Sequence, residues 1–258
     1  MTSLAGQSKA GGEAVWHDIE CGAYTADLPL WHELAAAAAS DDGACDLLEL
    51  GCGTGRVALE LAGPSCNVTA LDSDEELVRE LRSRAKRLDL PVRAVTGDAR
   101  AFDLGRGFDV VLAPMQLVQL IHDSGERLQL LRSVARHLRP GARFAFALLE
   151  LEQEWSAAPA DAPLADMREI DGWVYSSRPV AVRRARREQV IELDRVRDAV
   201  SPDGSLERSF SRVRLMLVSA RRLEQEGRRA GLVVERRRRI EPTEEHVGST
   251  VVVLRADG

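Results

Sequence analysis

The chain has 258 residues, of which 45% are hydrophobic, and its formal net charge is −6 at pH 7. This length accommodates one large α/β domain or a domain with an inserted cap, and no apolar run is long enough to cross a membrane. The surplus of acid disfavours a protein whose main ligand is nucleic acid, although arginines crowd the C-terminal half, for example at 236–239.

Cysteine and histidine usage points to neither disulfides nor metal. Cys21, Cys45, Cys52 and Cys66 have no Cys-x-x-Cys spacing, and the five histidines show no ligand-like pairing. The first residues lack the apolar segment of a secretory signal. We therefore expect a cytoplasmic protein without a bound metal, and a homodimer is left open.

The first part of the chain reads as an α/β alternation. Residues 1–12 are small, polar and rich in glycine, which predicts a disordered N-terminus, and 27–39 have the pattern of an amphipathic helix. Strands are predicted near 46–50, 67–72, 92–96, 108–113 and 143–149, with helices near 55–63, 74–88 and 124–138. Such apolar strands, alternating with helices, predict a mostly parallel sheet covered on both faces.

The pattern changes after residue 150. An irregular stretch at 152–170 precedes predicted strands at 173–177, 181–186, 189–198 and 207–218, with a hairpin turn at 201–204. A helix at 220–230 and strands at 232–240 and 249–254 follow. The predicted organisation is a core at 13–150, an antiparallel insertion or substrate cap at 151–205, and a C-terminal segment at 206–258 that completes the core sheet.

Residues 47–56 carry the strongest motif, Leu-Leu-Glu-Leu-Gly-Cys-Gly-Thr-Gly-Arg. A strand, a glycine turn and a helix in this order let backbone without Cβ atoms approach a nucleotide-like ligand. A dinucleotide fingerprint would need glycine or alanine where Arg56 stands.

This motif, with Glu49 two residues ahead of Gly51, resembles motif I of the class I S-adenosylmethionine (SAM) methyltransferases. Four further segments, at 68–72, 92–99, 108–115 and 138–148, resemble later motifs of the family in the same order, and together they cover roughly residues 20 to 150. The resemblance implies an α/β, Rossmann-like, doubly wound and mostly parallel sheet of seven strands in the order 3-2-1-4-5-7-6. It also implies an antiparallel β insertion after the fifth strand.

The resemblance implies SAM as cofactor and a set of residues around it. Asp72 would bind the ribose hydroxyls, Asp98 would accept from the adenine amino group, and Glu49 would support the methionine end. The structural alternatives are a mere tight turn for the glycines, a helix cap for Asp72 and a turn acid for Asp98. The implied cofactor contacts are Tyr24, Glu49, Gly51, Cys52, Gly53, Gly55, Asp72, Ser73, Asp98, Ala99, Pro114 and Met115.

The acceptor side is expected at the carboxyl ends of the strands, where ligands gather in open α/β sheets. His122 and Glu150 are candidates for a base or an acceptor-orienting group, although such residues are also common without a function. The predicted substrate-binding residues are Gln116, Gln119, Glu152, Trp155 and Tyr175.

The sequence thus favours a SAM-dependent methyltransferase that acts on nitrogen or oxygen of a small molecule, in specialised metabolism. An RNA or protein methyltransferase is the nearest alternative; the negative charge and the absence of an Asn/Asp-Pro-Pro-Tyr/Phe motif after the fourth strand weigh against it. An NAD-dependent oxidoreductase is disfavoured by Arg56 and by the later motifs. A SAM-binding protein without catalytic activity remains open.

Overall fold

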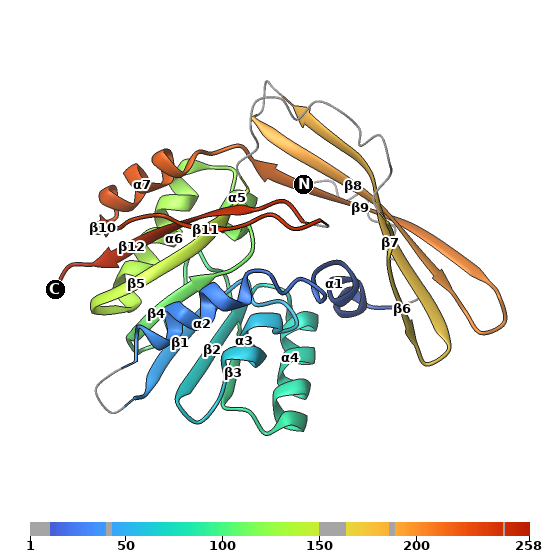
Figure 1. Cartoon of the computed structure of the whole chain (residues 1–258), viewed down its shortest axis with the longest axis horizontal. Helices are drawn as coiled ribbons and strands as arrows, with labels where there is room; N and C mark the ends of the chain where they lie inside the picture. Colours follow the sequence, from blue (N-terminus) through green and yellow to red (C-terminus); the bar gives the residue numbers. More distant parts are fainter. Residues whose placement is uncertain (1–10, 40–42, 150–163, 186–188, 245) are drawn as a thin grey trace. The chain divides into compact units, whose positions relative to one another are not determined.

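The computed structural model describes residues 11–39, 43–149, 164–185, 189–244 and 246–258 (Figure 1). The chain forms two compact units. The core unit comprises Thr25–Glu150 and Val218–Gly258, and the antiparallel unit comprises Met1–Tyr24 and Leu151–Leu217. None of the described helices combines the length and the apolar character needed to cross a membrane.

The core unit is built on one sheet in the order β3-β2-β1-β4-β5-β12-β10, with the short β11 also paired to β12. Strands β1 to β5 are parallel, and β12 is antiparallel to β5, β10 and β11. This confirms the predicted order 3-2-1-4-5-7-6. The strands are β1 (Cys45–Leu50), β2 (Cys66–Asp72), β3 (Val92–Thr96), β4 (Phe108–Ala113), β5 (Leu138–Leu148), β10 (Leu232–Val234), β11 (Arg238–Ile240) and β12 (Ser249–Ala256).

Helices cover this sheet, with α2 packed against α3 and α6 against α7 (Figure 1). Capping side chains begin two of these helices: Asp74 accepts the N–H groups of Glu76 and Leu77 ahead of α4, and Asp123 accepts those of Gly125 and Glu126 at α6. The helices are α2 (Leu28–Ala36), α3 (Arg56–Leu61), α4 (Glu75–Leu88), α5 (Leu117–Leu120), α6 (Ser124–His137) and α7 (Ala220–Arg229).

The antiparallel unit is a four-stranded sheet in the order β6-β7-β8-β9 with the N-terminal helix packed on it. Trp16 on the helix meets the ring of Tyr175 edge-on, with centroids 5.5 Å apart, and Ala199 lies in the same buried cluster. The elements are α1 (Glu13–Cys21), β6 (Asp166–Ile170), β7 (Trp173–Ala185), β8 (Val190–Val200) and β9 (Leu206–Met216).

A half-buried network of hydrogen bonds around Glu20 holds α1 on that sheet. The carboxylate of Glu20 accepts from Arg197 Nε at 2.7 Å and Nη2 at 2.9 Å, and from the Ser177 hydroxyl at 2.7 Å. These hydrogen bonds hold the pKa of Glu20 below its usual value even though burial raises it. Helix α1 is therefore held firmly on a sheet that residues beyond 164 form.

The structure corrects two predicted domain boundaries, the one between residues 205 and 206 and the start of the core at residue 13. Residues 206–216 form β9, which pairs along its whole length with β8 through the hairpin, so this segment extends the antiparallel sheet and not the core sheet. Residues 13–24 also belong to the antiparallel unit, because the apolar face of α1 is buried there. The predicted disorder at 1–12 lies almost wholly outside the described residues.

Smaller differences concern single elements. The two strands predicted at 173–177 and 181–186 are one strand, β7, with an irregularity between Pro179 and Ala181. The strand predicted at 232–240 is interrupted, because β10 and β11 pair with separate parts of β12. Strand β6 lies within the stretch that was expected to be irregular.

Candidate cofactor site

The glycine turn after β1 has a conformation that requires glycine. Gly51, Gly53 and Gly55 have φ angles of 69°, 53° and 92°, in the left-handed region that other residues rarely adopt. A Cβ on Gly55 would lie 2.2 Å from Leu81 Cδ1, so the turn is also pressed against α4. These two constraints leave the backbone bare at the carboxyl end of the sheet.

Asp72 stands beside this turn, at the end of β2. Its Oδ2 accepts from the Gly53 N–H at 2.8 Å and its Oδ1 accepts from the Asp74 N–H at 3.0 Å. The cap of α4 is Asp74, so the alternative of Asp72 as the helix cap is wrong. The structure thus brings the predicted ribose-binding carboxylate to the glycine turn, with Ser73 exposed next to it.

Glu49, on β1 just ahead of the turn, is buried with 3% of its surface exposed. The backbone N–H of Ala58 bonds the carboxylate, but its Oε2 has no hydrogen-bond partner. Burial raises the pKa of Glu49 to about 8, and the nearby Arg56 opposes that rise. An orphaned buried oxygen is costly unless a further group approaches it, so it marks a place for a ligand's donor.

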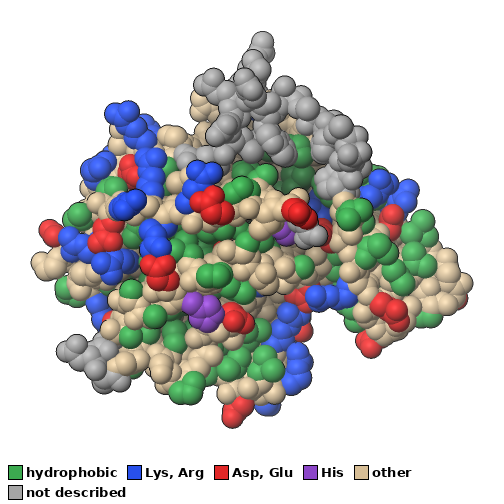
Figure 2. Space-filling view, viewed as in Figure 1, with side chains coloured by type: hydrophobic (Ala, Val, Ile, Leu, Met, Phe, Trp, Pro, Cys, Tyr) green, Lys and Arg blue, Asp and Glu red, His purple; other side chains and the backbone are tan. Residues whose placement is uncertain are grey.

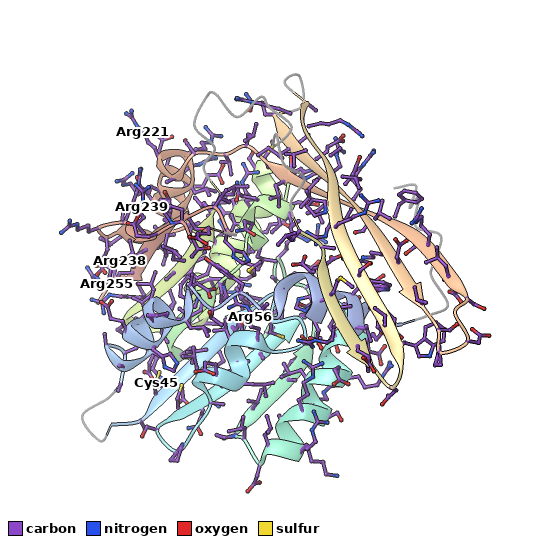
Figure 3. The ribbon with its side chains drawn as sticks, turned by 45° about the vertical axis from the view of Figure 1, so that its right-hand side comes forward. Cys45, Arg56, Arg221, Arg238, Arg239 and Arg255 are labelled. Carbon is purple, nitrogen blue, oxygen red and sulfur yellow. The ribbon has the colours of Figure 1, made fainter. Side chains whose placement is uncertain are left out.

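Arg56 itself is engaged by a residue that sequence reasoning assigned no role, Asp27. Its Nη1 and Nη2 donate to Asp27 Oδ1 and Oδ2, each at 2.7 Å, and Trp31 Nε1 donates to Oδ2 at 2.8 Å. Nη2 of Arg56, which is labelled in Figure 3, also lies 3.7 Å from Sδ of Met115, a residue that follows β4. The i, i+4 spacing of Asp27 and Trp31 was visible in the sequence, but their partner Arg56 was not.

Asp98 follows β3, in the loop predicted to meet adenine. Its carboxylate accepts from Arg100 Nε and Nη2 at 3.0 and 2.7 Å and from the Arg100 backbone N–H at 2.8 Å. The hydrogen bond from Arg100 holds the pKa of Asp98 below its usual value. The loop is tied to β2, because the Gly97 N–H donates to the Asp72 carbonyl. Asp98 and the neighbouring Ala99 stay predicted adenine contacts.

The other predicted cofactor residues lie in two places. Cys52 is buried within the glycine turn, and Pro114 and the half-buried Met115 follow β4 at the same edge of the sheet. Tyr24 belongs to the antiparallel unit.

The predicted acceptor residues have different outcomes. Gln119 is fully buried, and its amide clamps the backbone of Leu149: Nε2 donates to the carbonyl and Oε1 accepts from the N–H. Tyr175 is buried against Trp16. These contacts give both residues a structural role, and their predicted contact with the acceptor stays a prediction.

Gln116 and His122 are half-buried in the segment that follows β4. The three remaining predicted acceptor residues, Glu150, Glu152 and Trp155, lie outside the described residues. Among the residues that the structure describes, no three His, Cys, Asp or Glu side chains are grouped so as to hold a metal ion.

The arginine run at 236–239 is interleaved with acids. Arg237 pairs with Glu224 on α7 at 2.6 Å, and Arg238 pairs with Glu33 on α2 at 2.6 Å. Figure 2 shows blue and red side chains alternating on this face. Two of the four arginines of this run therefore have acidic partners on neighbouring helices.

Comparison with known proteins agrees with this geometry. Residues 47–141 match a family model described as a methyltransferase domain. The cypemycin N-terminal methyltransferase of Streptomyces sp is 40% identical over 95 residues, which are 37% of this chain and 38% of that protein. The chain thus spans only about two fifths of this curated relative.

Solved structures match nearly the whole chain. The sugar N-methyltransferase KedS8 from Streptoalloteichus sp ATCC 53650 has a TM-score of 0.72 at 19% identity, covering 100% of this chain and 98% of that one. CalS10, an amino pentose methyltransferase from Micromonospora echinaspora solved with SAM bound, has a TM-score of 0.66 at 19% identity, covering 96% and 99%. The chain therefore has the fold of these solved structures, and residues 47–141 match the methyltransferase domain model.

Proposed function

We propose that this protein transfers a methyl group from SAM to a nitrogen or oxygen atom of a small-molecule acceptor. The observation that carries the proposal is the buried Glu49 oxygen without a partner, beside a turn of three glycines and the Asp72 carboxylate. A site with two carboxylates and bare backbone suits a cofactor that carries a sulfonium, an ammonium and a ribose diol.

The residues around the turn fit this cofactor by chemical type. Glu49 would hold its methionine end, Asp72 its ribose and Asp98 its adenine. When bound, SAM supplies the electrophilic methyl group. The protein's contribution is to hold donor and acceptor in line and to exclude water. His122 and Glu150 are the proposed groups that orient or deprotonate the acceptor.

A small molecule is the proposed acceptor class because the chain carries a separate antiparallel unit besides its core sheet. KedS8 is a sugar N-methyltransferase and CalS10 is an amino pentose methyltransferase, and this likeness favours nitrogen on a compact polar acceptor and specialised metabolism. The negative net charge supports this class over nucleic acid.

The proposal is tested by titrating the purified protein with SAM and S-adenosylhomocysteine in a calorimeter, with NADH as a parallel ligand. We expect Asp72→Asn to weaken SAM binding by about tenfold or more, because it removes a charge-assisted acceptor. Asp109→Asn is the matched control, since Asp109 lies at the opposite end of β4 and pairs with Arg139. Binding of NADH but not SAM by the wild type would contradict the proposal.

Catalysis is tested separately by offering amines, phenols and carboxylates and measuring release of S-adenosylhomocysteine. We expect acceptor-dependent release from at least one amino sugar or related amine. SAM binding without any turnover across such a panel would instead support a SAM-binding protein without catalytic activity.

A further inference from the structure

Three ionisable groups interact near the glycine turn: Asp27 before α2, Glu49 on β1 and Arg56 at the start of α3. Two are acids and one is a base, and the guanidinium interacts electrostatically with both acids. Arg56 is close enough to Glu49 to oppose the rise in its pKa. The structure shows which acid Arg56 bonds.

That acid is Asp27, which is completely buried. Arg56 makes two parallel hydrogen bonds to it, at 2.7 Å each, a geometry that is among the strongest available to arginine. Trp31 adds a third bond to the same carboxylate. Glu49, in contrast, keeps its Oε2 without a partner.

We propose that Asp27 is a positioning residue that holds Arg56 away from Glu49 and so keeps the Glu49 carboxylate available to the cationic methionine end of the cofactor. The inference rests on the proposed function, because it takes SAM as the ligand. Without Asp27, Arg56, whose side chain is only 10% exposed, would lose its anionic partner, and the nearby Glu49 would be the acid left to pair with it. Arg56 and Glu49 would then form an ion pair. This pair would neutralise the Glu49 carboxylate and fill the space in which the ligand's ammonium group binds.

If Asp27 only supported the fold, removal of Arg56 would not repair its loss. The proposed positioning role predicts that it does. Asp27→Asn should raise the Kd for S-adenosylhomocysteine and the KM for SAM by about tenfold or more, with kcat at saturating SAM nearly unchanged. Asp27→Asn combined with Arg56→Gln should return both to within about threefold of the wild type, because the competing cation is gone. In a Glu49→Gln background, Asp27→Asn should cause no further loss of affinity for S-adenosylhomocysteine.

The matched control is a second acid–arginine pair at the other end of the sheet, Asp109 with Arg139. Asp109→Asn, alone or with Arg139→Gln, should leave S-adenosylhomocysteine affinity unchanged. If Asp27→Asn does not fold, as judged by circular dichroism, Asp27→Glu replaces it. That variant displaces the carboxylate without removing it, and Arg56→Gln should again reverse its loss of affinity.

The outcomes separate the two ideas. A wild-type protein that binds no S-adenosylhomocysteine overturns the proposed function, and the inference with it. Wild-type binding combined with an unchanged Kd in Asp27→Asn, or with a double variant as weak as the single one, overturns the inference alone.

Discussion

Gly55 combines two constraints that a single methyl group would violate. Its φ of 92° is unfavourable for an L side chain, and a Cβ would lie 2.2 Å from Leu81 Cδ1. We expect Gly55→Ala to lower the free energy of unfolding by roughly 1–3 kcal/mol, measured by urea denaturation. Gly63→Ala is the control, because nothing lies within 4 Å of its Cβ position and its φ is not positive. Equal losses in the two variants would contradict this account.

Glu49 makes stability depend on pH in the direction opposite to that of most carboxyl groups. Burial raises its pKa to about 8 in the folded protein, so the folded state keeps a proton that the unfolded chain releases near pH 4.5. This contribution to stability is fully present below the unfolded pKa and is lost as the pH rises through about 8. We expect Glu49→Gln, which mimics the protonated form, to flatten the decline in unfolding free energy between pH 5 and pH 8. An identical slope in both proteins would contradict the shift.

The sequence predicts site residues whose contacts lie close along the chain better than those whose partners are distant in sequence. Gly51, Gly55 and Asp72 act through the turn and strand end that carry them, and the motif marks these positions. Asp27 and Gln119 depend instead on partners far along the chain, Arg56 and Leu149, which no local pattern identifies. The sequence therefore suggests an acceptor contact for Gln119 but does not reveal that its amide bonds the Leu149 backbone.

A buried ion pair joins two helices of the core unit, Arg127 on α6 and Glu226 on α7. Nε and Nη2 of Arg127 donate to the two Glu226 oxygens at 3.0 Å, and Nη1 donates to the Ile121 and His122 carbonyls. The side chains are 4% and 1% exposed. Removal of Arg127 leaves the buried Glu226 carboxylate with Arg222 alone, whose Nε donates to Oε1 at 3.1 Å, and a buried charge that loses its main partner commonly costs more than loss of the whole pair.

Arg127→Met should therefore lower the free energy of unfolding by about 3–5 kcal/mol, and Arg127→Met with Glu226→Met should recover part of that loss. Urea denaturation measures both. Glu75→Gln is the control: its pair with Arg79 is exposed, at 3.8 Å, and is expected to contribute less than about 1 kcal/mol. A double variant no more stable than Arg127→Met would contradict the argument.

At the scale of elements, strands buried on both faces and capped helices were the most predictable. Leu47 and Leu48 in β1 and the run 110–113 in β4 are fully buried, as their continuous apolar sequence indicates. Helix α1 was not predicted, because it lies next to a glycine-rich segment. The continuity of β7 was missed because Pro179 reads as a strand end.

The two units have separate cores, so a core substitution should affect them unequally. Trp16→Ala removes the largest side chain of the cluster around Tyr175 and should destabilise the antiparallel unit by about 3–5 kcal/mol. In hydrogen–deuterium exchange we expect faster exchange in β6 to β9 and little change in β1 to β5. Leu81→Ala, in the core unit, should give the reverse pattern. Uniform acceleration in either variant would show that the units unfold together.

The order in which the chain is synthesised adds a consequence of the way α1 is used. Trp16 leaves the ribosome early, yet Tyr175 and Ala199, which cover it, follow only after the whole parallel part of the core sheet. At ordinary rates of translation this delay is on the order of ten seconds or more. During this delay a nascent chain presents the apolar residues of α1 without their partner, and fragments that stop near residue 150 retain that exposed face permanently.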